Sequence, residues 1–344
     1  MTPADLSLTV LHAVRRAVDD GALRVDVPPR VTVERARPGG SGEYASNIAL
    51  TLARPAGRSA LDVAGILQER LRDVPGLRGV EITGPGFLNF SLRRDADAGA
   101  ELVRAIREAG GAYGSSTALA GTSVRFAGPS DLTESRASVV TETVVRLLRT
   151  QGADAGFGGA ERMHVRAGAY DVDVLGVDAA RWALLRPAPQ DRPLDGPPLL
   201  VQHERNSLFR VQYAHSRVRR LLVNGRQLGL LPLYEGGAGA GPETDADVAF
   251  GAAASHPRTT ELLGVLGDHP VALLAAARHR APDRVARHLE ATADALLAFQ
   301  HTVLPLGDEK PSAAHRSRLA LAEAAGTVLA GGLSVLGISA PDRI

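Results

Sequence analysis

The spacing of apolar residues in the first third of the chain predicts a small domain of helices and strands. Residues 60–74, "ALDVAGILQERLRDV", carry apolar side chains three and four positions apart, as an amphipathic helix does. Further helices are expected at the N-terminus and over 96–110, and β-branched alternation predicts a strand within 25–37. Residues 77–93 predict a pair of strands around a Gly-Pro-Gly turn. The segment up to residue 115 is therefore expected to form an α+β domain.

Residues 116–197 combine strand and helix patterns in a segment too short for a complete doubly wound domain. An apolar strand begins at Val124, a helix ends near Thr150, and a glycine-rich link leads to a helix over 177–186. That helix stops where the run "PAPQDRPLDGPP" begins, because proline cannot continue it. The segment is expected to be a remnant of an α/β domain.

From residue 198 to the end, the apolar spacing is helical, apart from a glycine-rich insertion within 229–251. Prolines near the first turn open several of the expected helices. The simplest fold for this part is an all-α bundle, so the whole chain is expected to be a multidomain α+β protein. The expected helices cover residues 208–225, 256–268, 270–280, 281–304 and 313–337.

Composition narrows the classes of function. The net charge is +1, so no global field points to nucleic acid or membrane. There are no cysteines, which excludes disulfides, thiolate metal sites and cysteine nucleophiles. Arg15 and Arg16 interrupt the first apolar segment, and no apolar run reaches membrane-spanning length, so we expect a cytoplasmic protein without a membrane partner. No metal site is expected, because the histidines of the C-terminal part show no metal-binding pair; they are His256, His269, His279, His288, His301 and His315.

Three parts of the sequence resemble arginyl-tRNA synthetases. "SGEYASNIAL" with "GPGFLNFSL" is similar to the family's N-terminal additive domain, and "APDRVARHLEATADALLAFQ" with "RLALAEAAGTVLAGGLSVLGISAPDRI" to its DALR-type anticodon-binding domain. "DVDVLGVDAARWALLRPAPQDRPLD" and "VQYAHSRVRRLL" are similar to the segment that joins the catalytic and anticodon-binding domains. The resemblance implies tRNA-binding domains over 1–115 and 198–344, around a remnant of a Rossmann-type catalytic domain over 116–197.

The family's HIGH-type signature, which binds ATP phosphates at the start of a helix, is degenerate in this chain. The stretch "VRFAGPSDLTESRASVV" aligns with it, but Ser130 and Asp131 stand in a segment with neither of the histidines nor the glycine. Asp131 and Glu134 place negative charge where a triphosphate would bind, which is the wrong sign for that ligand.

The KMSK-type signature is also degenerate. Met163 and Arg166 match it, but Val165 stands where the lysine that contacts phosphate belongs. The two signatures lie about 25 residues apart here, whereas most of the family's catalytic domain lies between them. The resemblance therefore implies a synthetase from which most of the catalytic domain is missing.

The resemblance implies that the protein is a non-catalytic paralogue that binds tRNA, either tRNA-Arg or arginyl-tRNA. A second enzyme that uses arginyl-tRNA is a further expected partner. No cofactor is expected in that case. One alternative is arginine–tRNA ligase activity, which would require ATP. Another is a protein-interaction module that no longer binds tRNA.

Candidate tRNA-binding residues lie in both terminal parts. In the N-terminal part the resemblance implies that Phe87 and Asn89 contact a base of the tRNA D-loop, by stacking and an amide hydrogen bond. Asn47 is a further candidate for tRNA binding in this part. The alternative is that Phe87 and Phe90 face the core of a small sheet. In the C-terminal part a basic helix face with a stacking residue is typical of phosphate binding, although it can also be only a solvated surface. Those candidates are Arg210, Tyr213, Arg217 and Arg220, joined through the resemblance by Arg316 and Arg318.

Overall fold

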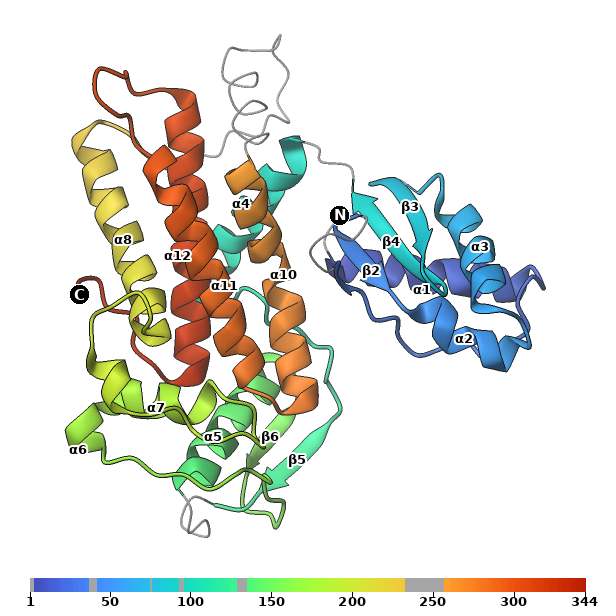
Figure 1. Ribbon diagram of the computed structural model, residues 1–344, viewed down its shortest axis with the longest axis horizontal. Coiled ribbons are helices and arrows are strands. Elements are labelled where there is room, and N and C mark those ends of the chain that lie inside the picture. The colour runs from blue at the N-terminus through green and yellow to red at the C-terminus, as the bar shows by residue number, and fades with distance from the viewer. Residues whose placement is uncertain (1–2, 37–41, 75, 93–95, 129–134, 233–256) are drawn as a thin grey trace. The chain divides into compact units, whose positions relative to one another are not determined.

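The computed structural model describes residues 3–36, 42–74, 76–92, 96–128, 135–232 and 257–344 (Figure 1). The chain forms two compact units, Met1–Ala98 and Gly99–Ile344. The expected multidomain α+β fold is confirmed, with small sheets and a helical C-terminal part. Ser130 and Asp131 lie outside the described residues.

The first unit packs helices against a four-stranded antiparallel sheet of order β1-β2-β4-β3. Alternate residues of β4, Leu88 and Phe90, are fully buried, as the period of two in a strand requires. The strand expected within 25–37 is reduced to Glu34–Arg35, because Pro28 and Pro29 supply no N–H to a ladder. The elements are α1 (Pro3–Asp19), β1 (Glu34–Arg35), β2 (Tyr44–Ser46), α2 (Ile48–Ala56), α3 (Ala60–Leu71), β3 (Leu77–Thr83) and β4 (Phe87–Leu92).

The second unit is built on a helical bundle in which α8, α12, α11 and α10 lie side by side (Figure 1). A parallel strand pair, β5 and β6, packs with α5 and α7 near one end of the bundle. The elements are α4 (Ala96–Ala109), η1 (Gly110–Ala112), β5 (Ser123–Phe126), α5 (Ser135–Thr150), β6 (Asp154–Phe157), α6 (Val172–Leu175), α7 (Val177–Leu185), η3 (Pro197–Leu200), α8 (Ser207–Gln227), α10 (Pro257–His279), α11 (Asp283–Phe299), η4 (Gln300–Thr302) and α12 (Ala313–Leu336).

A single hydrophobic core joins the middle segment to the bundle. Phe126 of β5 and Trp182 of α7 belong to the same buried cluster as Leu329 of α12. The helix α4, which the sequence places with the N-terminal part, contributes Val103 and Ile106 to this core. The three-domain division of the chain stays a prediction, whereas the packed units are two.

The helix α10 continues through Pro270, where the sequence predicts a break between two helices. Proline at this position cannot donate a hydrogen bond to the carbonyl of Leu266, four residues earlier. The hydroxyl of Tyr113 donates to that carbonyl instead, at 3.4 Å. The side chain of Tyr113, the C-cap residue of η1, therefore replaces the missing helical hydrogen bond. The sequence around Pro270 cannot reveal this contact.

The helix α12 is apolar because it lies in the core. By length and composition it could cross a membrane, contrary to the expectation from the sequence, but 67% of its most apolar window is buried within the protein. Glycines allow neighbouring helices to approach it closely. A Cβ atom on Gly332 would lie 2.5 Å from Leu289 Cδ2 of α11, so packing accounts for the small residues here.

Candidate nucleic-acid interface

The helix α8 supplies the frame of the candidate interface. Its N-cap is Asn206, whose side chain accepts a hydrogen bond from the Phe209 N–H at 3.1 Å. Val211, Ala214 and Val218 are buried on the side that packs in the bundle. This packing fixes the direction of the arginine side chains on the remaining faces.

The α8 residues predicted to bind RNA have different environments. Arg210 forms an ion pair with Asp294 of α11 at 3.0 Å, and Arg217 Nε donates to Gln300 Oε1 at 2.8 Å. Tyr213 is partly buried and stacks on Phe209 with 5.5 Å between ring centroids. Arg220 is exposed. Arg210 and Arg217 therefore also help to hold α8 against the end of α11.

Arginine side chains of α8, α10 and α12 lie near the end of α11 together with His301 of η4, in a group that we call the η4 cluster: Arg217, Arg258, His301 and Arg318. Arg258 Nη1 of α10 donates to the carbonyl of Ala298 at 3.0 Å and also contacts the ring of His301. Arg318 Nη1 of α12 donates to the carbonyl of Thr302 at 3.1 Å. Cations are favoured here because the last carbonyls of a helix carry partial negative charge.

The η4 cluster has an excess of positive charge that a phosphate could use. Arg217 contacts an amide oxygen and Arg318 a carbonyl oxygen, so neither contact neutralises the guanidinium. Such groups can release counterions from a nucleic-acid backbone when they bind it. Helix capping is a sufficient structural role for the same arginines, and the two roles are compatible. Arg316 lies on the first turn of α12, shortly before Arg318 in the sequence, and its side chain is partly buried.

The sequence does not reveal two members of the η4 cluster. Arg258 and His301 are far apart along the chain and come together only because α10 packs on α11. The one local signal is an arginine directly after Pro257, at the start of a helix. The candidate interface therefore includes a wider set of helices than the α8 pattern predicts.

In the first unit, the candidate residues lie at one end of the strands β2 and β4. Phe90 is buried, whereas Phe87 has 39% of its surface exposed, so Phe87 does not face the core. Asn47 is exposed at the N-cap position of α2, and its side chain makes no capping hydrogen bond. The Asn89 side chain is buried, and its Nδ2 donates to Thr83 Oγ1 at 2.6 Å. Phe87 and Asn47 are accessible to a base, and Asn89 already has a protein partner.

The two degenerate signatures pack against each other at the start of α5. The backbone N–H of Arg136 donates to the carbonyl of Gly168 at 3.1 Å, and Ser135 Oγ donates to the same carbonyl at 3.0 Å. Among the candidates here, Met163 packs on the core, and the Arg166 side chain is exposed. A protein carbonyl thus occupies part of the helix N-terminus, where a phosphate would need free N–H groups.

Arg136 holds these segments together from inside the protein. Its side chain is fully buried, and its guanidinium donates to five backbone carbonyls at 2.6 to 3.3 Å. Four of these five acceptors lie in loops, and one lies in the last turn of α7. They belong to Arg166, Leu184, Pro187, Ala188 and Asp191.

Two histidines of the bundle, His269 and His288, are used in packing. His269 is buried between Tyr113 and His288, with 5.8 and 5.1 Å between ring centroids. Burial, and to a smaller extent the charge of the neighbouring His288, together lower the pKa of His269 to about 3. Within the described ranges, no three His, Asp or Glu side chains are placed to hold a metal ion.

Comparison with known proteins gives matches at both ends of the chain. Residues 8–92 match the family model described as "Arginyl tRNA synthetase N terminal domain", and residues 211–344 match the "DALR anticodon binding domain". An arginine–tRNA ligase of Frankia alni is 27% identical over an alignment of 567 residues that covers all of both chains. This alignment is much longer than the 344 residues of the present chain. The arginine–tRNA ligase of Paenarthrobacter aurescens is 39% identical over 164 residues, which are 45% of this chain and 30% of the relative.

Two solved structures share the fold. The arginyl-tRNA synthetase of Thermus thermophilus matches with a TM-score of 0.67 and 12% identity, covering all of both chains. The Plasmodium falciparum enzyme matches with a TM-score of 0.65 and 7% identity, covering 99% of each. Together with the two domain matches, this likeness confirms the resemblance found in the sequence. The chain is an arginyl-tRNA synthetase-like protein that carries the N-terminal and DALR domains of that family.

Proposed function

We propose that this protein is a cytoplasmic, non-catalytic arginyl-tRNA synthetase-like protein that binds tRNA-Arg or arginyl-tRNA through its two terminal domains. The observation that carries the proposal is the η4 cluster. All four of its residues lie within 211–344, the range that matches an anticodon-binding domain. A cationic site of this kind binds the phosphates of RNA, and Arg220 extends it along α8.

The accessible residues of the first unit support a second contact with the same RNA. Phe87 offers an exposed ring for stacking, and the Asn47 amide lies on the adjoining strand end. Stacking plus an amide hydrogen bond is a common way to recognise an unpaired base. Both contacts together would favour a folded tRNA over an unstructured RNA of the same length.

The lack of catalysis is proposed from the chemistry of the middle segment. Val165 replaces the lysine of the KMSK-type signature, and the start of α5 is capped by the Gly168 carbonyl. Without the signature lysine, and with the Arg136 N–H already bonded to the protein, charge on a transferring phosphate has less stabilisation. We accordingly propose that the protein uses no ATP. A protein that delivers or sequesters arginyl-tRNA for another enzyme needs only the binding domains.

The test combines RNA binding with an activity assay on the full chain. We expect tRNA-Arg to bind more tightly than other tRNAs as the salt concentration rises, and we expect no arginine-dependent ATP–pyrophosphate exchange. A clear exchange signal would instead establish the arginine–tRNA ligase that the names of the relatives indicate. Affinity for tRNA-Arg no better than for random RNA, with a stable protein complex free of RNA, would favour an interaction module.

A further inference from the structure

The C-terminal tail, residues 337–344, is held along α8 by a series of polar contacts. The Ser339 N–H donates to Asp178 Oδ1 of α7 at 3.0 Å, and Gln212 Nε2 donates to the Ser339 carbonyl at 3.1 Å. Further along, Arg219 of α8 forms an ion pair with Asp342 at 2.9 Å. These contacts give a short segment with no secondary structure of its own a defined path on the bundle.

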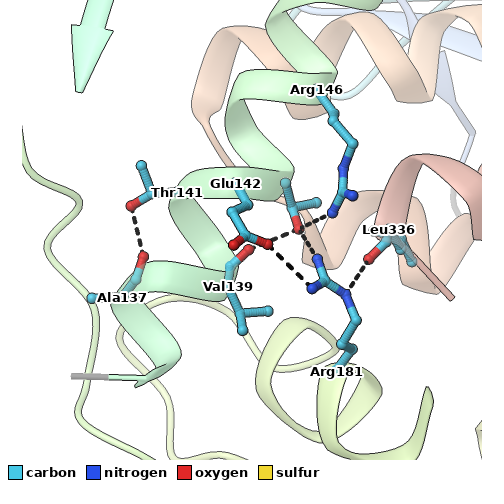
Figure 2. Close-up of polar contacts among 8 residues, drawn as sticks. Ala137, Val139, Thr141, Glu142, Arg146, Arg181 and Leu336 are labelled. Atoms are coloured by element: carbon cyan, nitrogen blue, oxygen red, sulfur yellow. Dashed lines mark hydrogen bonds and ion pairs between the residues drawn. The ribbon is translucent and has the colours of Figure 1, made fainter. Parts of the chain in front are cut away.

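The path starts from a seat formed by the middle segment, shown in Figure 2. Arg181 of α7 donates through Nε to the carbonyl of Leu336, the last residue of α12, at 2.9 Å. The same guanidinium pairs with Glu142 of α5 at 3.3 Å and donates to Thr143 Oγ1 at 3.3 Å. One side chain therefore ties α5 and α7 to the point where the tail leaves α12.

Arg146 completes the seat. Its Nη2 donates to Thr143 Oγ1 at 3.3 Å, so the two guanidiniums share one hydroxyl acceptor (Figure 2). Burial lowers the pKa of Arg146, and the positive charge of Arg181 lowers it further. Glu142 and the carbonyl end of α12 offset this repulsion, because both carry negative charge or partial charge.

Glycine is strongly favoured where the tail begins. Gly337 has a φ angle of 72°, in the left-handed region that ends helices. A Cβ atom at this position would lie 2.8 Å from both Arg146 Nη2 and Arg181 Nε. A side chain at this position would displace the two guanidiniums, so the turn and the seat depend on each other.

We propose that the middle segment acts as a seat for the C-terminal tail and that Arg181 is the positioning residue. The seat sets the direction in which the chain leaves α12, and Asp178, Gln212 and Arg219 then hold the tail along α8. The tail ends at Ile344, which lines a surface hollow of about 500 Å³ together with Val177 of α7 and Phe209 of α8. A role for this arrangement in RNA binding rests on the proposed function, whereas the seat itself does not.

Hydrogen exchange of the tail tests the seat without RNA. The N–H groups of Gly337, Ile338 and Ser339 are hydrogen-bonded, so their exchange reports release of the tail. Arg181→Met keeps most of the side-chain volume but removes the charged donor. We expect these amides to exchange about ten- to a hundredfold faster, the effect of losing a charged hydrogen bond. Protection within α10 and α11 should not change.

A matched control is available at the end of the same helix. Arg186, the C-cap residue of α7, forms an ion pair with Glu290 at 2.7 Å rather than with the tail, so Arg186→Met should leave tail exchange unchanged. Arg181→Lys should restore part of the protection because it keeps one charged donor. Gly337→Ala should release the tail with Arg181 intact, which covers the case that Arg181→Met does not fold. Wild-type tail exchange in Arg181→Met and Gly337→Ala, or equal acceleration in Arg186→Met, would overturn the proposal.

RNA affinity provides a separate readout. If the tail serves the interface, Arg181→Met and deletion of residues 338–344 should weaken tRNA binding equally, and their combination should cause no further loss. If the losses of binding free energy from Arg181→Met and from the deletion are additive, Arg181 affects tRNA binding independently of the tail. That result would contradict its role in positioning the tail for RNA binding. Because tail exchange is measured without RNA, failure of the proposed function and failure of the seat are distinguishable.

Discussion

Replacement of Arg136 by methionine should destabilise the second unit strongly without affecting the first. The side chain is fully buried, and its guanidinium satisfies five backbone carbonyls. Methionine fills a similar volume but leaves these acceptors without their donor. A stranded buried acceptor costs at least about 1 kcal/mol, and relief of the desolvated charge offsets part of the sum. We expect a loss of about 3 to 5 kcal/mol in the free energy of unfolding.

The assay can be restricted to the relevant unit. Trp182 is the only tryptophan of the chain, is fully buried, and lies in the core of the second unit. Urea unfolding followed by its fluorescence therefore reports this unit. Arg166→Met is the matched control, because only the backbone carbonyl of Arg166 contacts Arg136 and its side chain is exposed. This control should change stability by less than about 0.5 kcal/mol. Losses for the two variants within about 1 kcal/mol of each other would refute the reasoning.

Three further predictions concern other residues of the second unit. The pKa of His269 is lowered to about 3, so the unfolded chain binds a proton below about pH 6.5 that the folded chain does not. Stability should fall as the pH drops through this window, by about 2 kcal/mol from this group at pH 5, and His269→Phe should flatten the profile measured by urea unfolding. Arg220→Ala should weaken tRNA binding and reduce its salt dependence by about one phosphate contact. Arg104, which is also exposed but lies on α4, is the control, and Arg104→Ala should change neither quantity. Equal salt slopes for Arg220→Ala and the wild type in filter binding would exclude a phosphate contact of Arg220. Gly332→Ala should lower the thermal stability by about 1 to 3 kcal/mol, because its methyl group would meet Leu289 at 2.5 Å; an unchanged melting curve would mean that α11 can shift.

Local pattern was enough to predict the helices of the bundle and the paired strands of the first unit. The helical spacing over 208–225 corresponds to α8, and residues 77–93 contain β3 and β4. The errors arose where distant residues decide the local structure. Pro270 reads as a helix break, and only the hydroxyl of Tyr113, brought close by folding, compensates for the missing hydrogen bond.

The candidate site was predictable only in part for the same reason. The arginines of α8 form a visible pattern, but Arg258 and His301 join them through the packing of α10 on α11. The contact of Asn89 with Thr83 is, by contrast, local to the hairpin of β3 and β4, but the strand pattern alone does not show it. Arg136 gives no sign of its role in the sequence, because an arginine beside a polar loop is normally exposed. Its neutral carbonyl partners come from the loop at Arg166, from the last turn of α7 and from the loop that follows α7.

The central claim is that a chain with both terminal domains of the family binds tRNA-Arg. Its most direct test is equilibrium binding of the full chain to tRNA-Arg and to an unrelated tRNA at about 150 mM salt, where non-specific contacts are weakened. The account predicts that tRNA-Arg binds at least about tenfold more tightly, a difference of about 1.4 kcal/mol. Equal affinity for the two RNAs would contradict it.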